Sequence, residues 1–173
     1  VILNIGHTST TLVAFGKDSS FFTREIDIGG HEINTHIMKE LSIDYKNATK
    51  TKETKGVDTF NKENNVTTED SDAVSNSISI EKKTIFNDLV DEIRKTLRFY
   101  LKRNNQSFFN TFYLSGGSAL TPGLKEFISS SLNLNINYLD SMKNITNDIE
   151  IDNPMQYSLA IGLALRGLEE WSW

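Results

Sequence analysis

A strand, a double-glycine turn and a helix start follow one another at residues 108–124, and this motif constrains the fold more than any other feature. The apolar run Phe108–Leu114 is typical of a buried strand, and it leads directly into the turn Ser115-Gly116-Gly117-Ser118. We expect a helix next, with Thr121 as its N-cap and Pro122 at its first position. Glycines let a backbone approach a ligand closely, and a helix N-terminus attracts anions. The motif therefore predicts an α/β fold with a ligand site at the carboxyl end of a strand.

A second glycine turn lies near the start of the chain. The expected strand Val1–Ile5 ends at Gly6, and a run rich in β-branched residues from Thr10 to Gly16 predicts the next strand. Backbone N–H groups in such a turn can form an anion-binding nest, and hydroxyl side chains add further donors. A plain β-turn is the alternative interpretation, since Gly-Ser-Thr hairpins are common. The turn itself comprises Gly6, His7, Thr8 and Ser9.

The remaining signals predict strands and helices that alternate. In chain order they are a strand at 21–28 closed by Gly29-Gly30, a helix over 33–41, a short helix that Asp44 caps and that ends near Lys52, a long amphipathic helix at 82–104, a strand at 134–139, and a last helix at 155–168 opened by Asn153-Pro154. Short strands with tight links predict an antiparallel meander. We therefore expect an α/β domain whose mixed sheet contains Val1–Phe15, Phe21–Ile28 and Phe108–Leu114.

A polar, aperiodic stretch interrupts this pattern between residues 54 and 80. Residues 61–72 contain Val66 as their only aliphatic side chain. Such a segment cannot bury enough surface to offset the entropy lost on ordering. We interpret it as a mobile insertion, with a partner-binding loop as the alternative.

Composition argues against several classes of protein. The net charge is −5, and Lys and Arg are scattered among Asp and Glu without a dense basic block, so we expect no nucleic-acid partner. The lack of cysteine excludes disulfides and thiolate metal sites, and the spacing of His7, His31 and His36 suggests no metal site either. No Ser-His-Asp arrangement is legible, and no apolar run approaches the ~20 residues that span a bilayer. The chain begins in what reads as mid-strand, without Met or a signal-peptide pattern, so we expect it to be part of something longer.

Four segments carry a family resemblance. They are IGHTSTTLVAF (residues 5–15), FFTREIDIGGHEINTHI (21–37), YLSGGSALTPGLKEFISSSLNLNI (113–136) and SLAIGLALRGL (158–168). Together they resemble the PilM family of actin-like type IV pilus assembly proteins and, more distantly, the cell-division protein FtsA. Two glycine loops and a closing Ala-x-Gly-x-Ala helix are marks of the wider actin, Hsp70 and sugar-kinase superfamily. The resemblance covers nearly the whole chain except the insertion at 54–80, and it corresponds to the C-terminal lobe of that family only.

The resemblance implies a fold and a nucleotide site. The fold would be an actin-like ATPase (ribonuclease H-like) lobe, a mixed sheet flanked by helices with a small helical subdomain. Residues 1–41 and 107–173 would form subdomain 2A and residues 42–106 the smaller subdomain 2B. In the whole protein the cofactors would be ATP and Mg²⁺. Gly6, His7, Thr8 and Ser9 would form the second phosphate loop, Lys52 and Glu53 would line the adenine–ribose pocket, Gly116, Gly117 and Ser118 would cradle the nucleoside and α-phosphate, and the helix around Ile161 and Gly162 would support the hinge side.

One position departs from the family. Asn4 stands where the family usually has Asp, whose carboxylate helps to hold Mg²⁺ through water. Hard divalent cations need negatively charged oxygen ligands, and Asn supplies a neutral carbonyl. Phosphoryl transfer relies on positioning and metal electrostatics, so we expect the change to harm hydrolysis more than binding. Asn4 would then make at most an indirect contact with the metal.

The resemblance also implies a role. The chain would belong to a scaffold or adaptor of the type IV pilus inner-membrane assembly platform, cytoplasmic and peripheral at the inner membrane. Its partners would be the cytoplasmic tail of a PilN-like membrane protein, docked mainly on the missing lobe, the pilus motor ATPases and further copies of itself. Two alternatives remain open, an active ATPase or sugar-type kinase lobe and an FtsA-like filament-forming scaffold.

Overall fold

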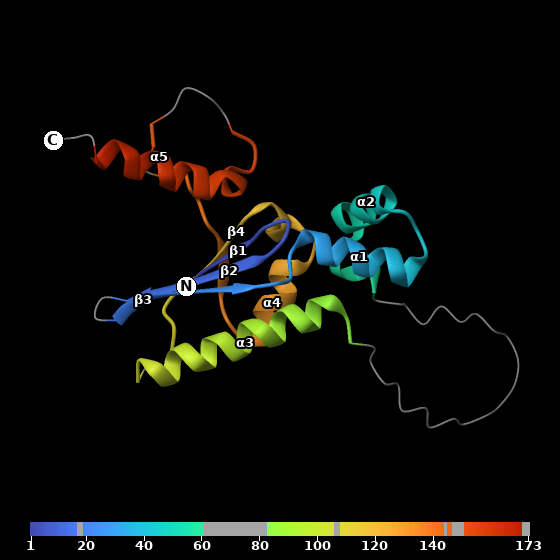
Figure 1. Ribbon diagram of the computed structural model, residues 1–173, viewed down its shortest axis with the longest axis horizontal. Coiled ribbons are helices and arrows are strands. Elements are labelled where there is room, and N and C mark those ends of the chain that lie inside the picture. The colour runs from blue at the N-terminus through green and yellow to red at the C-terminus, as the bar shows by residue number, and fades with distance from the viewer. Residues whose placement is uncertain (17–18, 61–82, 106–107, 144, 147–150, 171–173) are drawn as a thin grey trace, which may run out of the picture.

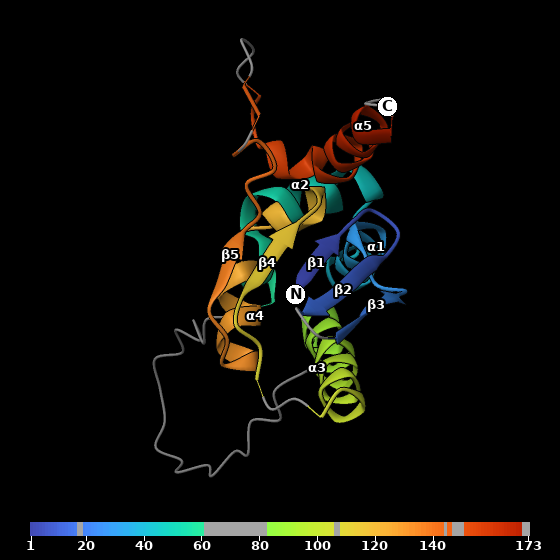
Figure 2. The same cartoon turned by 90° about the vertical axis from the view of Figure 1, so that its left-hand side faces the viewer.

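A five-stranded mixed sheet forms the centre of the fold (Figures 1 and 2). The computed structural model describes residues 1–16, 19–60, 83–105, 108–143, 145–146 and 151–170. Strand order is β3-β2-β1-β4-β5; β2 pairs antiparallel with both β1 and β3, and β4 and β5 run parallel to β1. The strands are β1 (Ile2–Ile5), β2 (Thr10–Gly16), β3 (Ser19–Ile26), β4 (Phe112–Ser115) and β5 (Ile136–Tyr138). The predicted meander and the mixed sheet are confirmed.

Helices cover the two faces of this sheet unequally. On one face α1, α3 and α4 enclose the core, whereas α5 stands off the opposite face (Figure 1). The helical elements are α1 (Gly30–Leu41), α2 (Tyr45–Lys55), the 3-10 turn η1 (Gly56–Thr59), α3 (Ile85–Arg103), η2 (Gly117–Leu120), α4 (Leu124–Leu132), η3 (Pro154–Tyr157) and α5 (Ser158–Glu170). None of the helices in the described part of the chain is both long and apolar enough to cross a bilayer.

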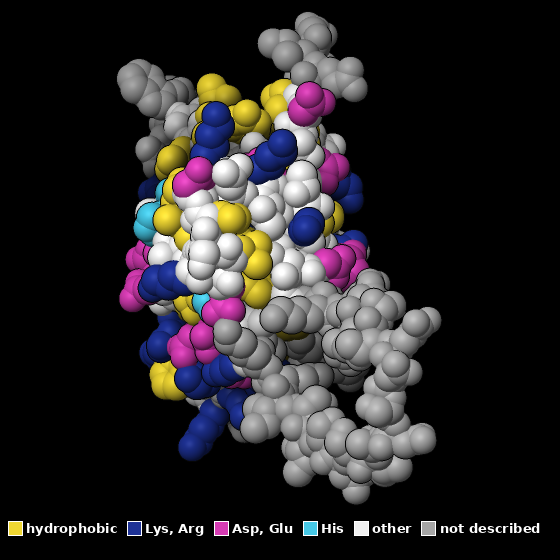
Figure 3. Space-filling view, turned by 90° about the vertical axis from the view of Figure 1, so that its right-hand side faces the viewer, with side chains coloured by type: hydrophobic (Ala, Val, Ile, Leu, Met, Phe, Trp, Pro, Cys, Tyr) yellow, Lys and Arg dark blue, Asp and Glu magenta, His cyan; other side chains and the backbone are white. Residues whose placement is uncertain are grey.

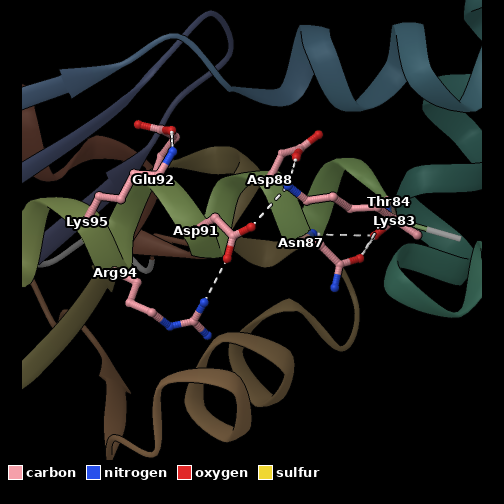
Figure 4. Close-up of polar contacts among 8 residues, drawn as sticks. All are labelled: Lys83, Thr84, Asn87, Asp88, Asp91, Glu92, Arg94 and Lys95. Carbon is pink, nitrogen blue, oxygen red and sulfur yellow. Dashed lines mark hydrogen bonds and ion pairs between the residues drawn. The ribbon is translucent and has the colours of Figure 1, made fainter. Parts of the chain in front are cut away.

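The long helix α3 follows its sequence pattern closely. Thr84 and Asn87 form a reciprocal capping box at its start, which satisfies two backbone donors that the helix leaves free (Figure 4). Along its outer face Asp91 pairs with Lys83 at 3.0 Å and with Arg94 at 2.7 Å. Arg94 also donates to the carbonyl of Ser131 at 3.0 Å, which ties α3 to the end of α4. The sequence predicts an apolar stripe from Ile85 to Leu101, and the inner face buries all of it except these two half-buried ends, namely Phe86, Leu89, Val90, Ile93, Leu97 and Tyr100.

Two local predictions around β4 are wrong. The strand begins at Phe112 rather than Phe108, because Phe109 leaves the line of the strand to stack on Tyr100 and Phe108 points into solvent. The helix start predicted at Thr121-Pro122 is also wrong. Thr121 accepts a hydrogen bond from the Leu124 amide at 3.1 Å, and Gly123 has φ +74° and ψ −8°. These are features of a type II β-turn, in which Pro precedes a glycine with positive φ, so α4 begins only at Leu124.

The polar stretch begins later than predicted. Helix α2 is capped by Asp44, as expected, but it continues to Lys55 and passes into η1. Val57 is buried and its amide donates to the carbonyl of Pro122 at 3.0 Å, so this apolar residue anchors a segment that composition alone assigned to the insertion. Residues 61–82 lie outside the described residues. The division into subdomains 2A and 2B stays a proposal; α2 packs chiefly on α1 and η1, whereas α3 contacts β3 and α4.

Candidate nucleotide-binding site

A cavity of about 740 Å³ opens where the parallel strands β1 and β4 end. Its volume falls within the range of about 300–1,000 Å³ typical of small-molecule sites. Eight of the ten residues predicted for a nucleotide site line it, and they come from three separate parts of the chain. The lining residues are Asn4, Gly6, His7, Lys52, Glu53, Gly116, Gly117, Ser118, Leu120, Thr121, Gln156, Tyr157 and Leu159.

In the turn between β1 and β2 the carbonyls of Gly6 and His7 are engaged, whereas two amides are not. The Gly6 amide donates to Ser9 at 2.9 Å and closes the hairpin. The carbonyls of Gly6 and His7 accept from the first amides of α1, those of Gly30 at 3.0 Å and His31 at 2.7 Å. Within the described residues the amides of His7 and Thr8 have no backbone partner. A turn with free N–H groups at a cavity is suited to hold an anion.

Gly29 allows this turn to lie against α1. A Cβ on Gly29 would come within 2.6 Å of both the His7 carbonyl oxygen and the Ser9 nitrogen. The sequence pattern marked Gly29-Gly30 only as the end of a strand. In the structure Gly29 also lets α1 pack closely against the turn.

Thr8 and Ser9 are the two predicted site residues that do not line the cavity. The Ser9 hydroxyl donates to the Glu25 carboxylate at 2.6 Å, so it is engaged away from the site. Glu25 reaches it because β3 pairs with β2 in a register that sets Glu25 opposite Thr11. That contact depends on strand pairing, which the local motif does not reveal.

The second turn, between β4 and η2, is held by backbone contacts. Gly116 has φ +89°, and its amide donates to the carbonyl of Met155 at 3.1 Å. A Cβ at this position would come within 2.5 Å of Asn4 Oδ1, so only glycine fits against the Asn4 side chain. This contact brings the ends of β1 and β4 together at the cavity.

Lys52 contributes a buried cation to the cavity wall. Its side chain lies on α2 and is only 8% exposed. Burial lowers the pKa of the Lys52 amine, and the neighbouring carboxylate of Glu53 partly opposes that shift. Among the described residues no carboxylate lies within ion-pairing distance of it. A buried ammonium without an ion pair is costly, so this site favours an anionic ligand.

The donors fit phosphate better than a resident metal ion. No group of three or more His, Asp or Glu side chains suited to a metal occurs among the described residues. Glu53 is the one carboxylate among the residues that line the cavity, and Asn4 is neutral. A divalent cation here would therefore depend on oxygens from phosphate and water.

Five lining residues were missed by sequence reasoning, namely Leu120, Thr121, Gln156, Tyr157 and Leu159. Three of them belong to η3 and the start of α5, which the Met155 carbonyl fixes next to Gly116 and to the Ser115 hydroxyl. The Asn153-Pro154 helix start was the available signal, but nothing in the sequence shows that it meets the end of β4.

Comparison with protein families identifies the chain. Residues 1–168 match the sequence model of the family described as type IV pilus assembly protein PilM. The chain belongs to the PilM family. No curated protein sequence matches it significantly.

Solved structures agree on the fold. A chain of the structure titled "PilM-PilN type IV pilus biogenesis complex" is similar over 96% of this chain and 45% of its own, with 22% identity and a TM-score of 0.71. The ethanolamine utilization protein EutJ from Carboxydothermus hydrogenoformans is similar over 95% of this chain and 48% of its own, with 13% identity and a TM-score of 0.59.

A third structure extends the set. It is the activator of the 2-hydroxyisocaproyl-CoA dehydratase from Clostridium difficile with bound ADPNP, similar over 98% of this chain and 59% of its own, with 15% identity and a TM-score of 0.50. The chain therefore has the actin-like ATPase fold, and it spans about half the length of these structures.

Proposed function

We propose that this PilM-family chain is one half of a nucleotide-binding adaptor in type IV pilus assembly. The observation that carries the proposal is the position of Lys52, a buried ammonium that faces a cavity together with two glycine turns. An activator with the same fold and bound ADPNP supports nucleotide as the ligand. In the whole protein we expect a second lobe to complete the site.

Each side of the cavity would take a different part of ATP. The turn of Gly6, His7, Thr8 and Ser9 would hold the terminal phosphates through the amides of His7 and Thr8, which have no backbone partner among the described residues. Gly116, Gly117 and Ser118 would approach the nucleoside and α-phosphate closely. Lys52 and Glu53 would contact the ribose and base, and the exposed ring of Tyr157 would offer a surface for stacking. Ser9 would support the turn. Asn4 would contact Mg²⁺ through water.

An adaptor fits the residues better than an active ATPase or sugar-type kinase. The carboxylate that would orient Mg²⁺ is replaced by the neutral side chain of Asn4, which lies against Gly116. Weak metal placement reduces phosphoryl transfer more than it reduces binding. An FtsA-like filament scaffold is the other alternative, and pelleting of the whole protein in the presence of ATP separates it from a non-polymerising adaptor.

The partners follow from the family by analogy. One of the similar structures is a PilM-PilN complex. We propose that the cytoplasmic tail of a PilN-like membrane protein binds mainly outside this chain and brings the protein to the inner membrane from the cytoplasm. Contacts with the pilus motor ATPases and with further copies of the chain belong to the same proposal.

A matched pair of lysine variants tests nucleotide binding. Calorimetric titration of the whole protein with ATP and Mg²⁺ should show affinity falling about 10-fold or more in Lys52→Met, since a charge-assisted hydrogen bond contributes about 1.5–3 kcal/mol. Lys50→Met removes an exposed charge from the same helix and should leave the affinity unchanged. Equal affinity in the two variants would contradict the proposed site. Steady phosphate release by the unmodified protein would contradict the adaptor.

A further inference from the structure

The second half of α3 carries basic side chains that the nucleotide site does not use. Residues 93–105 contain five Lys or Arg and no Asp or Glu. Arg98, Lys102 and Arg103 are exposed on the outer side of the helix. Among the described residues none of these three has a carboxylate within ion-pairing distance. The acidic residues of α3 all lie in its first half, where they pair with Lys83, Arg94 and Lys95 (Figure 4).

Exposed phenylalanines stand among these cations. Phe99 follows Arg98 and lies one helical turn before Arg103; it is 53% exposed, and Phe108 just beyond the helix is 71% exposed. The rings of Phe99 and Phe22 lie 6.0 Å apart, which fixes this part of α3 beneath β3. We call Arg98, Phe99, Lys102, Arg103 and Phe108 the basic–aromatic end of the molecule.

The neighbouring hairpin has the same character. Phe15 and Phe21, on β2 and β3, are also exposed, and their hairpin lies at the same end of the molecule as the last turns of α3 (Figures 1 and 2). Arg24 is exposed on the α3 side of β3, since it pairs with Leu12, whose side chain faces the core. Arg24 therefore extends the basic surface of α3 onto the edge strand β3, whereas Phe21 faces the other side of the sheet, since its neighbour Phe22 packs on Tyr100 of α3.

The helix dipole does not account for this arrangement. Cations favour the C-terminal turn of a helix, but the effect fades within that turn. Arg98 lies more than one turn before the end of α3 at Arg103, and no dipole effect favours an exposed Phe99. Elsewhere charges are mixed. The face formed by α1 and α2 shows Lys and Arg interspersed with Asp and Glu (Figure 3).

We propose that the basic–aromatic end binds the surface of an anionic phospholipid membrane. Basic side chains are attracted to acidic headgroups, and phenylalanines insert at the boundary between headgroups and acyl chains. The rings of Phe99 and Phe108 are exposed beside these cations, as insertion into a fluid surface requires. Because the chain as a whole is negative, a local basic end would also orient the molecule on the membrane.

The membrane proposal does not depend on the nucleotide proposal, and the two are compatible in space. Helix α3 lies on the opposite side of the sheet from α5, whose Leu159 lines the cavity (Figure 1). A molecule held on lipid through α3 would keep the cavity open. Direct lipid contact would add to any attachment through a membrane protein partner.

Vesicle flotation tests the charges. The whole protein should float with phosphatidylcholine vesicles that contain phosphatidylglycerol and much less with phosphatidylcholine alone. The triple variant Arg98→Gln, Lys102→Gln, Arg103→Gln should lower the partition coefficient about 100-fold, since each basic residue contributes roughly fivefold near an anionic surface. The control Lys39→Gln, Lys46→Gln, Lys50→Gln removes the same charge from exposed positions of α1 and α2 and should change it by less than about threefold.

Serine variants test the aromatic part. Phe108→Ser should reduce binding to anionic vesicles several-fold without affecting thermal unfolding, because the ring is largely exposed. Phe99→Ser adds to this loss, with circular dichroism as the check on folding. Equal flotation of the triple variant and its control would overturn the proposal. Failure of the unmodified protein to float with anionic vesicles at low salt would also overturn it. So would binding of the protein to polyglutamate without binding to vesicles, which would indicate an acidic protein partner. ATP titration of the same variants should be unchanged, so each proposal can fail alone.

Discussion

Helices α3 and α5 are both rich in apolar residues, yet they lie in opposite environments. Helix α3 places its apolar side chains in one stripe against the sheet and its charged ones outside, where Asp91 and Arg94 in the middle of the helix form an ion pair. Helix α5 has apolar residues all round, with Leu159 68% and Leu163 62% exposed, and it contacts little besides η3. The apolar stripe of α3 is therefore buried within this chain, whereas much of the apolar surface of α5 is not.

The largest expected difference concerns ATP on the α5 side, where Leu159 lines the cavity. We expect this chain alone to bind ATP with Mg²⁺ far more weakly than the whole protein and not to turn it over. Loss of three charge-assisted hydrogen bonds would cost about 4.5–9 kcal/mol, or some three to six powers of ten in affinity. Calorimetry and a phosphate-release assay on both proteins, each also as Asn4→Asp, measure the effect. Binding by the chain alone as tight as by the whole protein would show that one lobe suffices.

Truncation of leucine-like side chains compares the two helices directly. Ile93→Ala in α3 removes a fully buried side chain and should lower the free energy of unfolding by about 2–5 kcal/mol. Leu163→Ala in α5 should change that of this chain by less than about 0.5 kcal/mol, since the side chain is mostly exposed. Urea unfolding monitored by circular dichroism gives both values. Similar losses in the two variants would mean that α5 is packed after all.

A steric test concerns the packing of Gly29 against the turn between β1 and β2. Gly29→Ala should lower the free energy of unfolding by about 1–3 kcal/mol, because the added methyl group would collide with the turn of His7 to Ser9. Gly162→Ala in α5 is the matched control, since a Cβ there has no neighbour within 4 Å. A destabilised Gly162→Ala variant would show an unrecognised contact of α5.

Ion pairs on α3 should have a smaller effect. Arg94→Met removes both the Asp91 pair and the hydrogen bond to Ser131, and we expect a loss of about 1 kcal/mol. Lys95→Met removes only the pair with Glu92, made by a more exposed side chain, and should cost about 0–0.5 kcal/mol. Thermal unfolding of the two variants shows whether the tie between α3 and α4 matters more than surface charge.

Removal of the buried lysine should stabilise the chain slightly. Lys52→Met should raise the free energy of unfolding by up to about 1 kcal/mol at neutral pH, because the variant no longer has to bury a charge without an ion pair.

This advantage should depend on pH. The pKa of Lys52 is lower in the folded than in the unfolded chain, so between the two values the unfolded state holds more protons. The unmodified chain therefore gains stability as pH rises through that window. The difference in free energy of unfolding between Lys52→Met and the unmodified chain should therefore become smaller as the pH approaches the ordinary lysine pKa of about 10.4. Urea unfolding across this range, with Lys50→Met as control, gives the comparison. An advantage independent of pH would exclude charge burial as its cause.

Much of the fold was predictable because it depends on local pattern. The apolar stripe of α3 and the alternation in the first strands identify their own buried faces. Around Pro122 the local rule failed, because Thr-Pro-Gly is compatible with both a helix start and a type II turn. The cavity showed the same limit. Gly6 and Gly116 were identified by motif, whereas Tyr157 enters through a tertiary contact and Ser9 is diverted by strand register.

The hydrogen bonds between the first turn and α1 have a mechanical consequence. Because the carbonyls of Gly6 and His7 are bound by the leading amides of α1, the turn cannot move without carrying the helix. Asn34 on α1 in turn donates to the Thr49 hydroxyl on α2 at 2.9 Å, and α2 bears Lys52. The first turn, α1, α2 and Lys52 are thus linked by hydrogen bonds and by the chain itself, so a displacement at one wall of the cavity is transmitted to another.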